Sequence, residues 1–327
     1  MTVLVTGCAG FIGSRVTELL SQQGTNVVGI DNVNDAYDPR LKEWRLDRLK
    51  KIPNFRFEHV DITDRVALKK VFQDSDSISG NLEAVINLAA RAGVRQSVQD
   101  PWIYIDTNTT GLLNLLEICR ESGVPKLIQA STSSLYGALD QQPFREDANT
   151  DSPLSPYAAS KKAAEALCYA YHYLYGIDIT VLRYFTVYGP AGRPDMSLFR
   201  FVQWISEKRQ VTVYGNGKQS RDFTYVDDIA LGTIAGLKPL GYEVINLGSD
   251  HPEVLHNVIS LIESALGARA QIVYEPSHDA DVFATWADIS KAKKLLNWQP
   301  QTSLESGVDN LVSWYRQNRD WAKNIRT

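Results

Sequence analysis

A glycine-rich turn near the start of the chain constrains the fold more than any other segment. The letters TGCAGFIG (residues 6–13) begin at the last residue of the apolar run Val3–Thr6 and lead into an amphipathic stretch that ends at Gln22. A turn of this kind between a strand and a helix lets a pyrophosphate approach the free N–H groups at the helix N-terminus. An accidental glycine turn is the alternative. We expect cofactor contacts from Gly7, Gly10, Phe11, Ile12 and Gly13.

A carboxylate at the end of the second expected strand fits a dinucleotide. Asp31 closes the run VVGID, 18 residues after Gly13, and a spacing of about 20 suits a carboxylate that binds the ribose hydroxyls of NAD. An acid here repels the extra phosphate of NADP and no arginine follows at once, so NAD is favoured. A turn-capping aspartate is the alternative. Further cofactor contacts are expected, after successive strands, from Asn32, Asp61, Ile62, Leu88, Ala89 and Ala90. Asn108, in the next helix, is expected at the same cofactor site, where it would brace the strand-end backbone.

The first half of the chain alternates short β-branched runs with amphipathic stretches. Such alternation predicts an α/β fold, with a doubly wound parallel sheet (Rossmann) and helices on both faces. Strands are expected at Val3–Thr6, Asn26–Asp31, Phe55–His59, Ala84–Leu88, Lys126–Ala130 and Asp178–Arg183. Helices are expected at Gly10–Gln22, Leu41–Lys50, Asp64–Gln73, Ile105–Ser122 and Tyr157–Tyr175.

The pattern changes after Arg183. A Gly- and Pro-rich stretch, Tyr184–Ser197, leads into less regular elements, which predicts a smaller, interleaved C-terminal substrate domain. We expect an NAD-binding domain over residues 1–183, rejoined by strands near residues 244–248, and a substrate domain over residues 184–327. After Ser197 we expect elements at Leu198–Lys208, Val211–Tyr214, Asp227–Leu237 and Val244–Leu247, followed by two late helices.

Composition narrows the class of protein. The formal net charge is −4, which gives no general attraction to nucleic acid, so a nucleotide ligand must meet local positive groups. The three cysteines and five histidines stand at unpatterned spacings, and we expect neither disulfides nor a metal site. No apolar run is long enough to span a membrane, and the first residues lack the basic start of a signal peptide. We therefore expect a cytoplasmic protein without membrane partners.

A tyrosine and a lysine stand four residues apart in YAASK, at Tyr157 and Lys161, at the start of a helical stretch. This spacing places both on one helix face. A phenol with a pKa of about 10 is a poor base, but a nearby ammonium and the nicotinamide ring of NAD⁺ lower that pKa. A core contact and a solvated tail are the alternative. The hydroxyl row Ser131–Ser134, after an apolar strand, favours catalysis, because strand C-termini face the ligand crevice.

Together these motifs, with the later RDFTYVDD, resemble the extended short-chain dehydrogenase/reductase family and specifically its nucleotide-sugar epimerase branch. The resemblance covers essentially the whole chain. It implies NAD as cofactor and oxidation of a sugar at C4, with transient NADH. It also implies that Thr132 binds the sugar 4-hydroxyl, that Tyr157 is the base, and that Lys161 holds the nicotinamide ribose and lowers the pKa of Tyr157.

The residues after Thr132 indicate which reaction follows. Family 4,6-dehydratases carry an Asp-Glu pair there, and UDP-glucuronate decarboxylases usually carry Glu at the second position, whereas this chain has Ser133 and Ser134. The remaining path is 4-epimerisation, in which the keto sugar rotates and the hydride returns to its other face. A decarboxylase and a non-catalytic NAD-binding scaffold are further alternatives, although such scaffolds typically lose the Tyr or the Lys.

Three segments, at residues 31–42, 91–97 and 192–196, resemble UDP-glucuronate 4-epimerases more than UDP-glucose epimerases. A uronate needs donors for its carboxylate, for which Arg193, Ser133 and Ser134 are candidates; Arg193 could instead bind a phosphate or a partner subunit. Thr186 stands where hexose epimerases often carry Asn, and a UDP-hexose 4-epimerase is the principal alternative. Arg221 is the expected phosphate clamp. The remaining substrate contacts are expected from Arg91, Val213 and Tyr214.

The stretches Ile105–Ser122 and Tyr157–Tyr175 carry more aromatic and aliphatic residues than one buried helix face needs. Burial inside a monomer is one explanation. The resemblance implies another, because family members pair these helices into a four-helix bundle. We therefore expect a homodimer.

Overall fold

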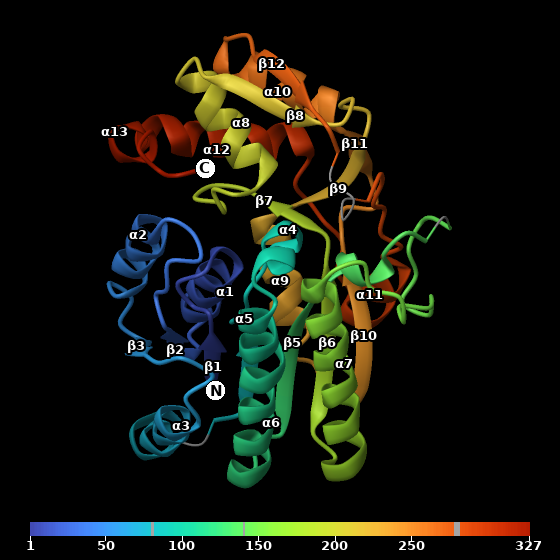
Figure 1. Ribbon diagram of the computed structural model, residues 1–327. Coiled ribbons are helices and arrows are strands. Elements are labelled where there is room, and N and C mark those ends of the chain that lie inside the picture. Colours follow the sequence, from blue (N-terminus) through green and yellow to red (C-terminus); the bar gives the residue numbers. More distant parts are fainter. Residues whose placement is uncertain (80–81, 140, 278–281) are drawn as a thin grey trace.

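A seven-stranded parallel sheet forms the centre of the computed structural model, which describes residues 1–79, 82–139, 141–277 and 282–327 (Figure 1). The strand order is β10-β6-β5-β4-β1-β2-β3, so the order reverses between β1 and β4. Ligands of such sheets bind outside the carboxyl ends of the strands at this switch point. The strands are β1 Thr2–Thr6, β2 Asn26–Asp31, β3 Phe55–His59, β4 Ala84–Asn87, β5 Lys126–Thr132, β6 Asp178–Tyr184 and β10 Tyr242–Leu247.

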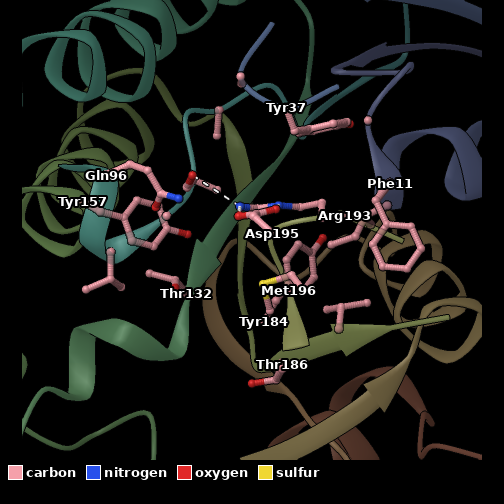
Figure 2. Close-up of a pocket in the computed structure, with 18 of the residues that line it drawn as sticks. Phe11, Tyr37, Gln96, Thr132, Tyr157, Tyr184, Thr186, Arg193, Asp195 and Met196 are labelled. Carbon is pink, nitrogen blue, oxygen red and sulfur yellow. Dashed lines mark hydrogen bonds and ion pairs between the residues drawn. The ribbon is translucent and has the colours of Figure 1, made fainter. Parts of the chain in front are cut away.

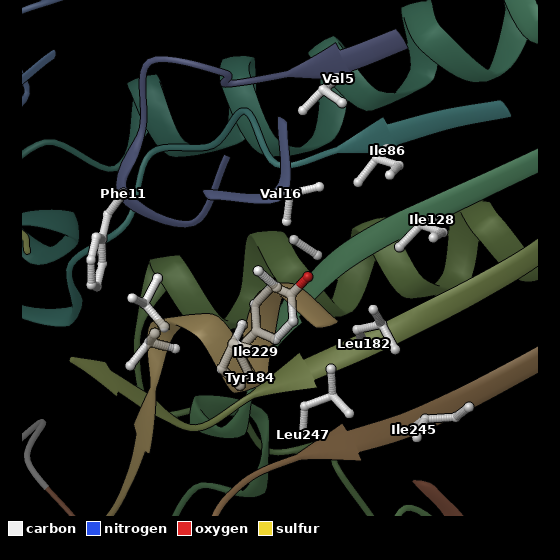
Figure 3. Packing of buried hydrophobic residues seen from close by; sticks show 14 of the residues in the cluster. Val5, Phe11, Val16, Ile86, Ile128, Leu182, Tyr184, Ile229, Ile245 and Leu247 are labelled. Carbon is white, nitrogen blue, oxygen red and sulfur yellow. The ribbon is translucent and has the colours of Figure 1, made fainter. Parts of the chain in front are cut away.

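Helices cover both faces of this sheet. Figure 3 shows one face, where Val5 and Ile86 of neighbouring strands lie near Val16 of α1 and Ile229 of α9. The adjacent residue Leu4 points to the other face, into a cluster with α3, α6 and α7. The helices are α1 Phe11–Gln22, α2 Pro39–Leu49, α3 Arg65–Ser79, α4 Val94–Gln99, α5 Trp102–Ile105, α6 Gly111–Ser122, α7 Pro156–Tyr175, α8 Ser197–Ser206, α9 Val226–Ala235, α10 Leu255–Leu266, α11 Ser290–Leu296, α12 Leu304–Gln317 and α13 Arg319–Ala322.

A smaller unit lies over the carboxyl ends of the central strands, at the top of Figure 1. It contains the three-stranded sheet β11-β9-β7 and the strand pair β12-β8. Helices α8, α10 and α12 share its hydrophobic core with strands β7, β8, β9 and β12. The strands are β7 Thr186–Tyr188, β8 Gln210–Tyr214, β9 Ser220–Tyr225, β11 Pro252–Val254 and β12 Gln271–Glu275.

The doubly wound α/β fold predicted from the alternation is confirmed, but two predictions are wrong. The expected helix Ile105–Ser122 is interrupted by a π-helical turn at Asp106–Thr110, where the Asn108 side chain binds neighbouring backbone. Four helices, α10 to α13, follow β10 rather than two. The chain returns to the central sheet at β10, which pairs with β6, and the domain boundary between residues 183 and 184 remains a prediction.

Among the described residues, no helix combines the length and the apolar character that crossing a bilayer requires. In the same ranges, no three His, Cys, Asp or Glu side chains gather as metal ligands.

Candidate active site

A cavity of about 620 Å³ lies between the carboxyl ends of the central strands and the smaller unit. It brings together residues that are far apart in the sequence. All the predicted site residues except Arg91 and Asn108 line it. They are Gly7, Gly10, Phe11, Ile12, Gly13, Asp31, Asn32, Asp61, Ile62, Leu88, Ala89, Ala90, Thr132, Ser133, Ser134, Tyr157, Lys161, Thr186, Arg193, Val213, Tyr214 and Arg221.

The turn between β1 and α1 is built so that only glycine fits at two positions. Gly7 has φ +68°, and a Cβ there would lie 2.7 Å from the backbone nitrogen of Ala89. A Cβ at Gly13 would lie 2.0 Å from the carbonyl oxygen of Gly7. The turn therefore packs closely against the first turn of α1. Its backbone borders the cavity directly and forms a cradle there. Such a cradle at a helix N-terminus fits the pyrophosphate of NAD.

Asp31 stands beside this turn with its carboxylate buried and already oriented. It accepts hydrogen bonds from the backbone N–H groups of Ala9 (3.1 Å) and Val33 (2.7 Å). The ammonium of Lys42, a cavity residue that the sequence did not single out, lies 3.6 Å away and offsets part of its charge. The fixed carboxylate at the end of β2 fits the ribose hydroxyls of the same cofactor.

Asp61 and Asn32 also lie together at this end of the cavity. The Asn32 amide donates to the Asp61 carboxylate at 2.6 Å. Burial raises the pKa of Asp61, but its hydrogen bonds from Thr63 and Asn32 outweigh burial and leave the pKa below its ordinary value. Asp61 is therefore a carboxylate at neutral pH.

Neither Arg91, an expected substrate contact, nor Asn108, expected at the cofactor site, lines the cavity. The Asn108 side chain instead accepts from the N–H of Arg91 and donates to its carbonyl, at 2.8 and 2.9 Å. It also donates to Ser160 Oγ, which links the backbone after β4 to α7. Asn108 therefore braces the strand-end backbone, which is the role that the sequence predicted for it.

The end of β5 and the start of α7 supply the predicted catalytic residues (Figure 2). Thr132 is the last residue of β5. The Ser155 hydroxyl caps α7 by accepting from Ala158 N–H, and Pro156 occupies the first turn, which fixes where the helix begins. Tyr157 and Lys161 then follow one helical turn apart, both facing the cavity.

The protonation of Tyr157 depends on its surroundings. Burial raises the pKa of the phenol, whereas its hydrogen bond with Thr132 and the charge of Arg193 lower it, and the net pKa is above its ordinary value. We expected Lys161 to lower the pKa of Tyr157. The Lys161 ammonium instead donates to the carbonyl of Ala130 at 3.0 Å, so Thr132 and Arg193 act on the phenol in its place.

Burial lowers the pKa of Lys161 to about 8, so burying its charge costs stability at neutral pH. In the unfolded chain a lysine holds its proton up to a pKa of about 10.4. Between these two values the unfolded state binds more protons, so the contribution of Lys161 to the free energy of unfolding rises with pH. Lys161→Met removes this cost, so without NAD the variant should be more stable than the natural protein at pH 7. This difference in the free energy of unfolding should shrink by about 2 kcal/mol between pH 7 and pH 9.5.

Urea denaturation at both pH values measures this difference. Lys162→Met, at the next position with its ammonium on Thr150, is the matched control and should keep the pH dependence of the natural protein. An advantage of Lys161→Met that is the same at both pH values would contradict the prediction.

A neighbouring carboxylate holds Arg193 in place. Its guanidinium forms an ion pair with Asp195, with Nε 3.0 Å from Oδ1, and donates to the Ala92 carbonyl at 3.4 Å. The pair keeps the pKa of Asp195 below its ordinary value despite burial. Asp195 therefore orients Arg193 toward the cavity, a role that the sequence did not predict.

At the opposite end of the cavity, near β8, an arginine and an aromatic ring lie in contact. The guanidinium of Arg95 lies 4.0 Å from the centroid of the Tyr214 ring, and Arg221 donates to the carbonyls of Ser220 and Phe283. The sequence pointed to Arg221 and Tyr214 but not to Arg95, whose only signal was its place in the segment 91–97. Two arginines and an aromatic ring that line the same cavity fit a nucleoside diphosphate.

The fold and this site define an extended short-chain dehydrogenase/reductase. The chain belongs to the family of these enzymes whose model is described as GDP-mannose 4,6 dehydratase, which matches residues 4–311. The acidic pair that 4,6-dehydratases carry after the catalytic Thr is replaced here by Ser133 and Ser134.

Particular relatives are more informative. The chain is 56% identical to the UDP-glucuronate 4-epimerase of Thermodesulfobacterium geofontis, over 99% of this chain and 98% of the relative. The UDP-glucuronic acid 4-epimerase of Bacillus cereus, solved with UDP-glucuronic acid and NAD, matches with a TM-score of 0.91 and 38% identity, over 97% of this chain and all of that one. The UDP-glucose 4-epimerase of Thermotoga maritima, solved with UDP-glucose, matches with a TM-score of 0.88 and 32% identity, over 98% of this chain and all of that one.

Proposed function

We propose that this protein is an NAD-dependent UDP-glucuronate 4-epimerase, which interconverts UDP-glucuronate and UDP-galacturonate. The observation that carries the proposal is the Arg193 guanidinium, which Asp195 holds in the same cavity as Tyr157 and whose charge reaches that phenol. A fixed positive charge beside the catalytic phenol suits a sugar whose carboxylate is attached next to the reacting C4. The high identity to a UDP-glucuronate 4-epimerase supports the same substrate.

The residues of this chain bind the reactants and move a proton. Tyr157, assisted by the Thr132 hydroxyl, takes the proton of the sugar 4-hydroxyl and later returns it. The glycine turn and Asp31 would hold NAD, and Lys161 would hold its nicotinamide ribose. When bound, NAD supplies a hydride acceptor and then a hydride donor at C4. The 4-keto sugar rotates between the two transfers, so the hydride returns to the opposite face of the same carbon.

A 4-keto uronate is a β-keto acid and loses CO₂ when its carboxylate bond aligns with the carbonyl π-system. An epimerase must therefore hold the carboxylate out of this alignment while the ring rotates. Ser133, Ser134 and Arg193 all line the cavity, and Thr132 accepts from Ser134 N–H, which fixes this turn. We assign these three side chains the tethering of the carboxylate.

Arg193→Ala should raise the KM for UDP-glucuronate about tenfold to a hundredfold, the effect of losing charge-assisted hydrogen bonds. A UDP-pentose should also appear, because the freed carboxylate can reach the alignment in which CO₂ leaves. Chromatographic separation of the UDP-sugars measures both effects, and the affinity for UDP is the control, expected within about twofold. Unchanged affinity for the uronate with no pentose would contradict the tether.

One assay of the natural protein distinguishes the proposed epimerase from the alternative functions. With UDP-glucuronate and UDP-glucose supplied separately, we expect UDP-galacturonate from the first and much slower turnover of the second. Preferred turnover of UDP-glucose would identify a hexose epimerase, which Thr186, in place of the Asn of many hexose enzymes, disfavours. A pentose as the main product would identify a decarboxylase, and no turnover of either substrate would identify a non-catalytic NAD-binding protein.

We also infer that the protein is a homodimer. Helices α6 and α7 lie side by side (Figure 1) and leave Leu113, Tyr169, Tyr173 and Leu174 exposed, an apolar surface that suits pairing with the same helices of a second copy. Light scattering should give twice the 36.6 kDa of one chain, and Tyr173→Glu should shift the mass toward one chain. A natural protein of single-chain mass would contradict the dimer.

A cytoplasmic location completes the proposal. The three cysteines, Cys8, Cys119 and Cys168, are buried and unpaired, and burial raises the pKa of each thiol. Unpaired thiols are typical of reducing compartments.

A further inference from the structure

An arginine is buried behind the active site. Arg45 lies on the inward face of α2 with 2% of its surface exposed. Its hydrogen bonds go to the carbonyls of Ala9, Ala191 and Gly192 and to the Tyr37 hydroxyl, and no ion pair of Arg45 is found in the described ranges. A buried charge is costly unless it is well hydrogen-bonded, so neutral acceptors hold this cation in place.

The three carbonyls that accept from Arg45 belong to two loops that are expected to bind different ligands. Ala9 lies in the glycine turn, where its N–H donates to Asp31 and its carbonyl accepts from Arg45 Nη1 at 3.0 Å. Ala191 lies in the loop that carries Arg193 and Asp195, and its carbonyl accepts from Arg45 Nη2 at 2.6 Å. One rigid guanidinium thus joins the cofactor turn to the loop expected to bind the uronate.

The loop that Arg45 holds is conformationally strained. Ala191 has φ +51°, in the left-handed region that residues with a Cβ rarely adopt. Such a conformation persists only where the surroundings enforce it. The bond from Arg45 falls on the carbonyl of this residue, two positions before Arg193, so Arg45 helps to fix the direction in which the loop presents Arg193.

We propose that Arg45 is a positioning residue, which holds the Arg193 loop in register with the NAD-binding turn and so makes the cavity selective for a uronate. Arg45 acts through Arg193 and does not itself line the cavity. The proposal rests on the proposed function, because the ligand that Arg193 is expected to bind is the sugar carboxylate.

Binding measured in a Tyr157→Phe background with saturating NAD tests the proposal without turnover. Adding Arg45→Met should raise the Kd for UDP-glucuronate about tenfold, while the Kd for UDP, which lacks the sugar, should stay within about twofold. Arg48→Met is the matched control, three residues on in α2 with an exposed guanidinium paired to Glu18, and should change neither Kd. Arg45→Lys, which keeps the charge but not the fork, should give an intermediate loss and replaces Arg45→Met if that variant does not fold.

A double variant distinguishes positioning from general damage. If Arg45 acts through Arg193, Arg45→Met should add little to the loss caused by Arg193→Ala. Equal weakening of UDP and UDP-glucuronate, or full additivity with Arg193→Ala, would overturn the proposal. The proposed function is tested separately: if the natural protein binds UDP-glucuronate but forms no UDP-galacturonate, the function fails while the binding comparison still decides the role of Arg45.

Discussion

Tyr157→Phe is expected to lower the turnover of UDP-glucuronate by about 10³-fold, within the range of 10²–10⁴ that positioned acid–base groups contribute. The variant keeps the ring and loses only the hydroxyl that accepts and returns the proton of the sugar 4-hydroxyl. Binding of NAD and of UDP-glucuronate should remain close to that of the natural protein, because the glycine turn, Asp31 and Arg193 are untouched.

Initial rates of UDP-galacturonate formation, with calorimetry for both ligands, measure these effects. Tyr171→Phe is the matched control: Tyr171 lies on the same helix and is buried, but its hydroxyl donates to Glu117 outside the cavity. It should turn over UDP-glucuronate at nearly the natural rate. A Tyr157→Phe variant within tenfold of the natural rate would show that another group moves the proton.

The second large effect is on stability. Arg183 and Glu165 form a bidentate ion pair beneath the catalytic strand, with Nη2–Oε2 at 2.7 Å and Nε–Oε1 at 2.9 Å. Both side chains are buried, and Ser131, next to Thr132, donates to Glu165. Arg183→Met leaves the carboxylate buried without its partner, and we expect the free energy of unfolding to fall by about 3–5 kcal/mol.

The double variant Arg183→Met/Glu165→Met tests the cause. Because it removes both charges, it should recover much of the stability lost in Arg183→Met, as apolar replacements of buried pairs commonly do. Urea denaturation of the NAD-free proteins gives both values. A double variant less stable than Arg183→Met would mean that the network to Ser131 matters more than the pair.

The central sheet was predictable because its signals are local. Strands β1 and β2 are short apolar runs, each followed by a helix, and the predicted bounds of β2 and β3 match those observed. The three-residue strands β7 and β11 are too short to show a period of two. They form only because β9 lies between them, and such a distant pairing leaves no mark on the local sequence.

The residues of the site also differ in whether a local sequence pattern predicts them. Gly7, Asp31 and Tyr157 stand in local motifs, and each lines the cavity. Arg45 donates to carbonyls that are far away in the sequence, and Asp195 acts on Arg193 within an irregular loop. No helical or strand spacing therefore points to either residue. One signal for Arg45 is present in the sequence. It shares a helix face with Leu41 and Leu49, four residues away on either side, where an amphipathic pattern predicts an apolar residue.

The return of the chain at β10 has a consequence for synthesis on the ribosome. Strand β6 is complete at Tyr184, but its outer edge has no partner until Tyr242–Leu247 emerge. At translation rates of about 5–20 residues per second, this edge stays open for on the order of ten seconds or less. An open parallel edge is a template for aggregation, so the edge of β6 is exposed to wrong pairing for an interval that ends only when β10 covers it.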